Sequence, residues 1–342
     1  MEGLGAMSTY QNIIPSFDSN RVQLGKVLPL DTPFTVILDS SEACNFRCSY
    51  CFRSENDKKA WGYAADNQLM SWEIFEKAVS QIWQFPQNVK QISLSHHGEP
   101  LVNRNLPKMV QYIKEQGFDG KVSIHTNGSL LTSEYAEELA EANIDKIVIS
   151  LQGLDSDAYK RVCEATVDFE ELHQNLSYFF QIKKDTQINI KIVDAALKRG
   201  EEDKFYQLFS GIADRVFIET VAPIWKEKDF TDLQREDQLV FNKFGKGFSP
   251  QKICPVIFHT LVVLPNGDVY PCTQLLSTEK LGNIQDKTLV EMWNSEERRK
   301  LLKRQCQFCA PEICTDCGIR QNSIFSEEDM LDDYSADILK KL

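Results

Sequence analysis

The sequence predicts an α/β protein built on a parallel sheet, and two observations carry this prediction. Short apolar segments typical of strands alternate six times with amphipathic helical segments between about residues 34 and 225. Several strand segments, such as 146–151, are nearly continuous apolar runs, which is typical of strands covered by protein on both faces. Repeated strand–helix units imply right-handed crossovers and parallel pairing. Element order alone leaves a doubly wound sheet and a partial barrel both open.

Each element has a local signal. Ser71 and Thr132 are expected to cap helices ending near residues 83 and 142, and Gly117 is expected to close the helix at 106–115. The expected strands lie at 34–38, 89–95, 121–125, 146–151, 188–193 and 216–221. Further helices are expected at 156–162, 169–183 and 202–212.

A different module is expected towards the C-terminus. Apolar runs at 259–264 and 268–271 flank Pro265-Asn266-Gly267, which predicts a hairpin with a type I′ turn. A helix is expected from residue 289 to about 303. The predicted division of the chain is an N-terminal extension (1–33), an α/β domain (34–225), a polar connector (226–253), a cysteine-rich module (254–325) and a tail (326–342).

Composition and charge exclude several classes of protein. The 342 residues are 42% hydrophobic and 26% charged, as in ordinary globular proteins. No apolar run approaches the roughly 18–20 residues that span a bilayer, and no export signal is evident, so we expect a cytoplasmic protein without a membrane partner. The net charge of −12 disfavours binding to nucleic acid. A cationic substrate would suit an acidic protein, but a solvated acidic surface explains the charge equally well.

Cysteines are numerous and unevenly placed. Ten cysteines without an export signal favour metal ligation over a disulfide framework. Three lie in one early loop and six lie beyond residue 250, so only Cys163 stands alone. Its simplest role is that of a small buried hydrophobe, with a hydrogen-atom donor as the alternative.

The early trio Cys44, Cys48 and Cys51 has the spacing C-x3-C-x2-C and follows the first predicted strand. Iron–sulfur clusters normally take four cysteines, so three thiolates in a short loop can leave one iron of a four-iron cluster open to an outside ligand. Half of a zinc site and free buried thiols are the alternatives. The spacing, with Tyr50 just before the last cysteine, closely resembles the signature of radical S-adenosylmethionine (SAM) enzymes.

That resemblance implies a fold and a cofactor. The family's core is a partial (β/α)6 TIM-like barrel, in which a [4Fe-4S] cluster binds the amine and carboxylate of SAM. Sites in such barrels lie at the carboxyl ends of the strands, which is where the cysteine loop falls. The cluster ligands implied are Cys44, Cys48 and Cys51.

Residues after the second and third strands match the family's SAM-binding positions. His97-Gly98-Glu99 resembles its Gly-Gly-Glu motif, whose residues bind the SAM amino group, with His97 in place of the first glycine. Thr126-Asn127-Gly128 places small polar groups at the same rim, and we take Asn127 as a further cofactor-binding residue. Tyr50 would pack near adenine.

The fourth strand carries a less complete match. Ser150 begins a segment similar to the family's Ser-(Ile/Leu)-Asp-Gly, in which the serine contacts SAM, but Gln152 replaces the aspartate. Arg161 stands about where related enzymes place an arginine against the SAM carboxylate. A surface helix arginine is the equal alternative.

The second cysteine set also forms a metal-site pattern. From spacing alone, paired C-x2-C units could hold zinc. The arrangement is similar to the SPASM and twitch extensions of radical SAM enzymes, which bind auxiliary four-iron clusters, although a full SPASM module has seven cysteines. The resemblance implies one or two auxiliary [4Fe-4S] clusters, at least one involving Cys254 and Cys272. The candidate ligands are Cys254, Cys272, Cys306, Cys309, Cys314 and Cys317.

The resemblance implies an oxidoreductase that cleaves SAM reductively to a 5′-deoxyadenosyl radical and abstracts a substrate hydrogen atom. The expected substrate is a small molecule such as a sugar or aminocyclitol, because only about 33 residues precede the first strand, too few for a peptide-recognition domain. Oxidation, dehydrogenation or epimerisation would follow, with a reductase or flavodoxin-type electron donor as partner. The alternatives are peptide or protein side-chain modification, a glycyl-radical activating enzyme, and a non-catalytic metal-binding interaction protein.

Overall fold

The structure, a computed structural model, describes residues 21–54, 67–222, 233, 251–272, 279–315, 317–322 and 327–342. The connector predicted at 226–253 lies almost wholly outside these ranges. In the part of the chain that is described, no helix is long and apolar enough to cross a membrane.

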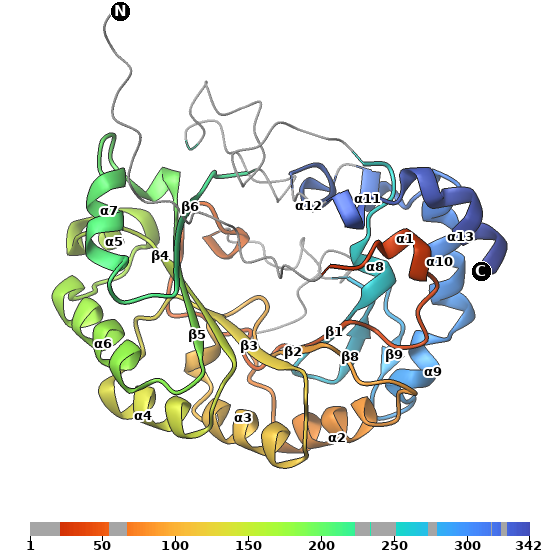
Figure 1. Cartoon of the computed structure of the whole chain (residues 1–342), viewed down its shortest axis with the longest axis horizontal. Helices are drawn as coiled ribbons and strands as arrows, with labels where there is room; N and C mark the ends of the chain where they lie inside the picture. The colour runs from red at the N-terminus through yellow and green to blue at the C-terminus, as the bar shows by residue number, and fades with distance from the viewer. Residues whose placement is uncertain are drawn as a thin grey trace, which may run out of the picture.

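One curved sheet of nine strands organises the molecule, in the order β6-β5-β4-β3-β2-β1-β7-β8-β9. The six predicted strands are present and parallel, which confirms the α/β class and the partial barrel. Helices cover the convex side of the sheet, and the concave side faces the centre of the barrel (Figure 1). These strands are β1 (Thr35–Leu38), β2 (Gln91–Ser93), β3 (Lys121–Thr126), β4 (Lys146–Leu151), β5 (Gln187–Val193) and β6 (Arg215–Glu219).

The helices of the barrel begin where polar caps predict. The Ser71 hydroxyl accepts a hydrogen bond from the Ile74 N–H at 3.3 Å, and the Thr132 hydroxyl accepts from the Tyr135 N–H at 3.2 Å. Gly117 follows its helix with a φ of +78°, which glycine adopts without steric cost. These helices are α2 (Trp72–Ile82), α3 (Leu106–Glu115), α4 (Ser133–Glu141), α5 (Ser156–Cys163), α6 (Phe169–Ile182) and α7 (Glu202–Phe209).

The C-terminal hairpin continues the barrel sheet, which the sequence did not predict. β7 (Thr260–Val263) pairs in parallel with β1, and β8 (Asp268–Tyr270) pairs antiparallel with β7. The short β9 (Gly282–Asn283) completes this edge. Because β1 lies between β2 and β7, the cysteine-rich module is joined to the barrel by backbone hydrogen bonds.

The predicted type I′ turn of this hairpin is wrong. The Gly267 N–H donates to the Leu264 carbonyl at 2.9 Å, and the Leu264 N–H donates to the Asp268 carbonyl at 2.9 Å. Within the loop 265–267, only Gly267 has a positive φ, of +85°. A type I′ turn needs a positive φ at both Asn266 and Gly267, and Asn266 does not have one; the observed turn spans Leu264 to Gly267, with Pro265 at its second position, where a φ near −65° is favoured. The loop is therefore a three-residue connection with glycine at its left-handed position.

The helix predicted at 289–303 is two helices. α9 (Leu289–Trp293) ends before Ser295, which caps α10 (Glu296–Cys306) by accepting from the Arg298 N–H at 3.2 Å. Asn and Ser favour caps and turns because their side chains bond to nearby backbone, which explains the break at 294–295. The shorter helices are α1 (Leu24–Val27), α8 (Val256–His259), α11 (Glu312–Thr315), α12 (Gly318–Asn322) and α13 (Ser335–Lys341).

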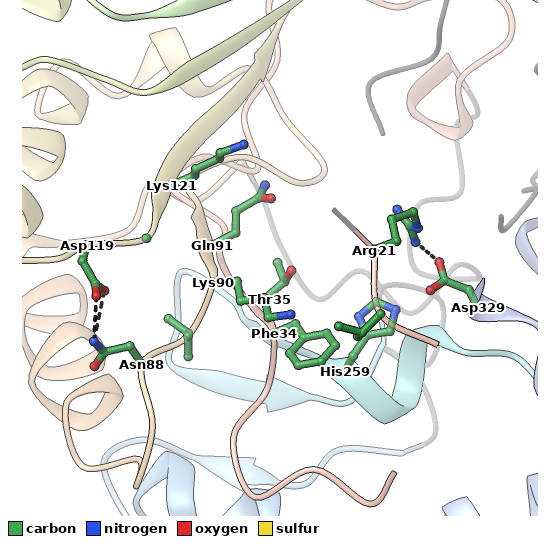
Figure 2. Close-up of a pocket in the computed structure, with 13 residues that line it drawn as sticks. Arg21, Phe34, Thr35, Asn88, Lys90, Gln91, Asp119, Lys121, His259 and Asp329 are labelled. Atoms are coloured by element: carbon green, nitrogen blue, oxygen red, sulfur yellow. Dashed lines mark hydrogen bonds and ion pairs between the residues drawn. The ribbon is translucent and has the colours of Figure 1, made fainter. Parts of the chain in front are cut away.

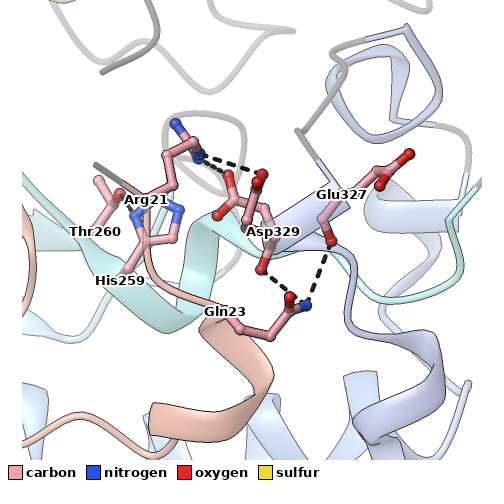
Figure 3. A network of polar contacts seen from close by, with 7 residues as sticks. Arg21, Gln23, His259, Thr260, Glu327 and Asp329 are labelled. Atoms are coloured by element: carbon pink, nitrogen blue, oxygen red, sulfur yellow. Dashed lines mark hydrogen bonds and ion pairs between the residues drawn. The ribbon is translucent and has the colours of Figure 1, made fainter. Parts of the chain in front are cut away.

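A cavity of about 550 Å3 opens at the amino ends of β1, β2 and β3. Phe34, Gln91, Lys121 and His259 are among its lining residues (Figure 2). Figure 3 shows the polar contacts beside it, where Arg21 forms an ion pair with Asp329. This cavity is at the end of the barrel opposite the cysteine loop, so it is not the candidate active site.

Candidate functional site

The cysteine loop follows β1 and ends in η1 (Phe52–Ser54), at the carboxyl end of the barrel. Its turn is closed by the Cys51 N–H, which donates to the Cys48 carbonyl at 2.9 Å. Cys44, Cys48 and Cys51 are all half-buried. The pKa of Cys48 lies well above its usual range because of a hydrogen bond with Cys163, burial, and the nearby Cys51, Cys163 and Cys44 thiols. The three predicted ligands therefore lie close enough to influence one another.

The backbone at Cys163, at the end of α5, forms hydrogen bonds with the cysteine loop. The isolated position of Cys163 in the sequence did not suggest this role. The Arg47 N–H donates to the Cys163 carbonyl at 3.0 Å, and the Ser49 N–H donates to the Val162 carbonyl at 2.8 Å. Cys163 is fully buried, as predicted. The end of α5 thus fixes the backbone on both sides of Cys48.

Gly98 and Glu99 hold the other side of the loop. The Glu99 N–H donates to the Ala43 carbonyl at 2.8 Å. A Cβ atom on Gly98 would stand only 2.1 Å from the Ser41 carbonyl oxygen and 2.4 Å from that of Ala43. Only glycine allows this approach without moving the backbone that leads into Cys44.

The Glu99 carboxylate is buried and accepts hydrogen bonds on both oxygens. Oε1 accepts from the Thr126 hydroxyl at 2.5 Å and from the Leu101 N–H at 3.0 Å, and Oε2 accepts from the Asn127 N–H at 2.7 Å. Burial raises the pKa of Glu99 to about 7, against these hydrogen bonds, which lower it. The Asn127 amide in turn donates to Asn45 Oδ1 at 2.9 Å, inside the cysteine loop. The predicted residues Gly98, Glu99 and Asn127 are therefore gathered with the cysteines.

Tyr50 and Ser150 lie at the same end of the barrel, whereas Arg161 is exposed on α5. Burial, and next the proximity of Cys48, raise the pKa of the Tyr50 phenol well above its usual range. Ser150 is half-buried near the carboxyl end of β4, and the Gln152 amide donates to its carbonyl at 2.7 Å. Arg161 is exposed in the last turn of α5, as the surface-arginine alternative expects.

A buried acid–histidine pair at this end was not predicted. Asp39 directly follows β1, and its Oδ2 lies 3.5 Å from Nδ1 of His97, with the two side chains 0% and 2% exposed. The Phe52 ring packs edge-on against His97, with centroids 5.8 Å apart. The substitution of His97 for the family's glycine was the one sequence signal for this pair.

The second cysteine set separates into four thiols and two. Burial, and then Cys272 and Cys317, raise the pKa of Cys254 well above its usual range. Burial alone raises the pKa of Cys306, to about 11, and Cys309 is exposed. One small cavity is lined by Cys254, Ile257, Cys272, Ile313, Cys314, Cys317, Ile319 and Arg320. The structure thus brings together four of the six candidate ligands and leaves Cys306 and Cys309 outside.

Both sets suit iron–sulfur clusters. Three half-buried thiols at the barrel mouth leave one coordination position for another ligand, whereas four thiols around a largely apolar cavity form a complete set. Across the described ranges, no group of three or more His, Cys, Asp or Glu side chains is gathered tightly enough for a single metal ion.

The fold and the cysteine sets define a SAM-dependent iron–sulfur enzyme. Residues 39–194 match the sequence profile of the Radical SAM superfamily, and residues 254–318 match that of SPASM, an iron–sulfur cluster-binding domain. The chain therefore belongs to the radical SAM enzymes that carry a SPASM domain. This family assignment implies a SAM-binding [4Fe-4S] cluster and auxiliary iron–sulfur clusters.

Known relatives agree with this assignment. The tungsten-containing aldehyde ferredoxin oxidoreductase cofactor-modifying protein of Pyrococcus furiosus is 25% identical over 321 residues, which cover 83% of this chain and 86% of that protein. The structure of BtrN with AdoMet and 2-DOIA shares the fold at a TM-score of 0.52 and 18% identity, covering 86% of this chain and 96% of BtrN. SuiB of Streptococcus suis, bound to its precursor peptide SuiA, has a TM-score of 0.58 at 18% identity, covering 92% of this chain and 78% of SuiB.

Proposed function

We propose that this radical SAM enzyme oxidises a small molecule by removing a hydrogen atom and then a proton and an electron. The observation that carries the proposal is the pairing of one incomplete thiol set at the barrel mouth with one complete set in the adjoining module. A four-iron cluster on the three-thiol set would keep one iron free for a further ligand, whereas a cluster on the four-thiol set would keep none. The three-thiol set suits a site that starts a radical reaction, and the four-thiol set suits a site that receives an electron.

When bound, the cofactors supply a 5′-deoxyadenosyl radical at the barrel mouth and an electron acceptor in the cysteine-rich module. The protein's own part is to hold the loop and to place charge around it. Gly98 sets the position of the backbone before Cys44, and α5 sets the backbone around Cys48. Cys44, Cys48 and Cys51 would hold the first cluster, and an external reductase or flavodoxin-type protein would supply its electron.

Polar residues around the loop would orient SAM. Glu99 and Asn127 form a hydrogen-bonded unit beside the loop, suited to a cationic amine once Glu99 is ionised. Tyr50 would pack against adenine, and Ser150 would contact the ribose or carboxylate. Arg161 would need a different side-chain conformation to reach the SAM carboxylate, because its present position is exposed.

The four-thiol cavity is proposed as the auxiliary cluster site. Cys254, Cys272, Cys314 and Cys317 would hold it, without a free position for substrate. Because only these four of the six candidate thiols line the cavity, one auxiliary cluster is favoured over two. β7 and β8 connect this module to the barrel through β1.

A small-molecule substrate is favoured over a peptide by one relative. The Pyrococcus furiosus protein aligns over most of both chains, and its name describes modification of a cofactor. The SuiB structure, which holds a precursor peptide, supports peptide side-chain modification as the second candidate. The cysteines would have the same roles in the oxidation of either class of substrate.

The test is incubation of the anaerobically reconstituted enzyme with SAM and dithionite. We expect 5′-deoxyadenosine and methionine in equal amounts, measured by liquid chromatography. Absence of 5′-deoxyadenosine from protein that carries its full iron content would overturn the proposal.

A further inference from the structure

Among the described residues that line the four-thiol cavity, Arg320 is the one charged side chain besides the cysteines. Its guanidinium donates through Nη1 to the Lys252 carbonyl at 2.9 Å and through Nη2 to the Thr315 carbonyl. Lys252 is two residues before Cys254, and Thr315 directly follows Cys314. The guanidinium therefore links the two chain segments that carry these cysteines, and its position at the cavity is fixed.

The positive charge of Arg320 acts on the cysteines of this cavity. Within the described ranges its hydrogen bonds go to backbone carbonyls, which carry no net charge, and its Nε is buried without a hydrogen-bond partner. Burial and the neighbouring thiols raise the pKa of Cys314, whereas the charge of Arg320 lowers it. Burial likewise raises the pKa of Cys317, and the N–H and the charge of Arg320 lower it. Arg320 thus favours negative charge on the sulfur atoms of both cysteines.

A second arginine lies behind the wall of the cavity. Arg298, in α10, is 6% exposed, and its guanidinium donates to the Trp293 carbonyl at 3.0 Å and to the Ile257 carbonyl at 3.1 Å. Ile257 lines the cavity, three residues after Cys254. Burial lowers the pKa of Arg298 to about 9, so the side chain is still charged at neutral pH. A buried charge that bonds only to neutral groups is costly, and a nearby negative charge would offset that cost.

One carboxylate beside the cavity opposes these charges. Asp332 Oδ1 accepts from the Ile253 N–H at 2.9 Å, next to Cys254, but Asp332 does not line the cavity. The charge at the cavity surface is therefore positive, in a protein whose net charge is −12.

A positive charge at this place bears on electron transfer. A four-iron cluster held by four thiolates is negatively charged, and it gains one more negative charge when it accepts an electron. Its reduction potential depends on net charge, on hydrogen bonds to the sulfur atoms and on exposure to solvent. Charges interact more strongly in weakly polar surroundings, and the remaining side chains that line this cavity are isoleucines. Arg320 would therefore stabilise the reduced cluster more than the oxidised one.

We propose that Arg320 raises the reduction potential of the cluster in the four-thiol cavity, with a smaller contribution from Arg298, and so makes this cavity an electron acceptor. The inference rests on the proposed function, in which the four-thiol set receives the electron that the substrate radical loses. That step is balanced, because the radical is oxidised by one electron and releases a proton while the cluster is reduced by one electron. Arg320 acts through the cluster and not on the substrate.

The test is a redox titration of the reconstituted full chain, followed by electron paramagnetic resonance. The variant in which Cys44, Cys48 and Cys51 are all alanine identifies the signal of the cluster in the four-thiol cavity. Arg320→Gln should shift the equilibrium of this cluster about tenfold towards the oxidised form, a decrease of about 59 mV for one electron. Arg320→Lys keeps the charge and should retain most of the wild-type potential. Lys300→Gln removes an exposed charge from α10 and is the matched control, because solvent and salt screen that charge.

Three results would overturn the proposal. They are an unchanged potential in Arg320→Gln, an equal decrease in Lys300→Gln, and a decrease in Arg320→Lys as large as that in Arg320→Gln, which would assign the effect to the backbone hydrogen bonds. Arg298→Gln should give a smaller decrease than Arg320→Gln. If Arg320→Gln fails to hold iron in the four-thiol cavity, a decrease in Arg298→Gln supports the proposal and an unchanged potential overturns it.

Formation of 5′-deoxyadenosine from SAM is measured on the same samples. Wild-type protein that forms it, together with a potential that is insensitive to Arg320, refutes only this inference. Protein that shows the expected shift but never forms 5′-deoxyadenosine refutes only the proposed function.

Discussion

The two cysteine sites of this molecule use the same ligand in opposite surroundings. Cys44, Cys48 and Cys51 are half-buried in a loop at the barrel mouth, beside the buried polar unit of Glu99 and Asn127. The other site is a cavity lined by four cysteines, three isoleucines and Arg320. The first site, Cys44, Cys48 and Cys51, has three thiols and polar neighbours, and we call it the open site. The second, which we call the closed site, has four thiols and mostly apolar neighbours besides Arg320. Under the proposed function, ligand count and surroundings together would separate the site that binds a further ligand from the site that accepts an electron.

Loss of the open site should have the largest effect. Replacing Cys44, Cys48 and Cys51 together with alanine should abolish 5′-deoxyadenosine formation, because no other described thiols lie at the barrel mouth except Cys163. Iron analysis should show a loss of about four irons per chain, with the closed site still loaded. Retained cleavage of SAM in this variant would show that these three cysteines do not hold the SAM-binding cluster.

Loss of the closed site should separate substrate oxidation from SAM cleavage. Cys272→Ser removes one of four ligands of the closed site, so turnover of substrate should stop while uncoupled cleavage of SAM continues. Cys309→Ser is the matched control, because that exposed thiol lies outside the cavity and its loss should leave both iron content and turnover intact. Equal loss of iron in the two variants would mean that Cys309 is also a ligand.

The sequence predicted the open site better than the closed one. Its ligands are within eight residues. Asn127 directly follows β3, and Gly98 and Glu99 lie in the loop after β2, so the alternation of strands and helices places all three at one end of the barrel. The closed site depends on which cysteines a small module brings together, and spacing alone left six candidates. The selection of four became visible only from the cavity that they line.

Other features could not be predicted because they depend on contacts between distant segments. The pairing of β7 with β1 joins residues more than 200 positions apart, and nothing in either strand specifies its partner. Cys163 reaches Cys48 only because α5 packs under the cysteine loop.

A smaller change should weaken the open site alone. Gly98→Ala forces a Cβ atom against the Ser41 and Ala43 carbonyl oxygens, so the backbone before Cys44 must shift. We expect reduced iron at the open site and at least a tenfold loss of SAM cleavage, with the closed site unaffected. Gly211→Ala is the control, because a Cβ atom there would meet nothing within 4 Å. Normal SAM cleavage by Gly98→Ala would exclude the close approach as a requirement.

The smallest effect should be a pH dependence confined to the open site. The pKa of Glu99 is raised from 4.5 to about 7, so burial of this carboxyl stabilises the fold fully only below about pH 4.5, and that stabilisation is lost as the pH rises through about 7. If the ionised carboxylate orients the amine of SAM, affinity for SAM should increase about tenfold from pH 6 to pH 8.

Glu99→Gln tests this pH dependence, because the amide has nearly the same shape but does not ionise. We expect its affinity for SAM to be low and nearly constant from pH 6 to pH 8. Its thermal stability should be lower than that of the wild type below pH 7, because the amide NH2 cannot accept from the Leu101 or Asn127 N–H, but it should not fall further as the pH rises through about 7. Calorimetric titration of SAM and thermal melts across this range measure both effects, while the absorbance of the closed-site cluster should stay constant. An unchanged pH profile in Glu99→Gln would assign the dependence to another group and leave Glu99 with only its structural contacts to Thr126 and Asn127.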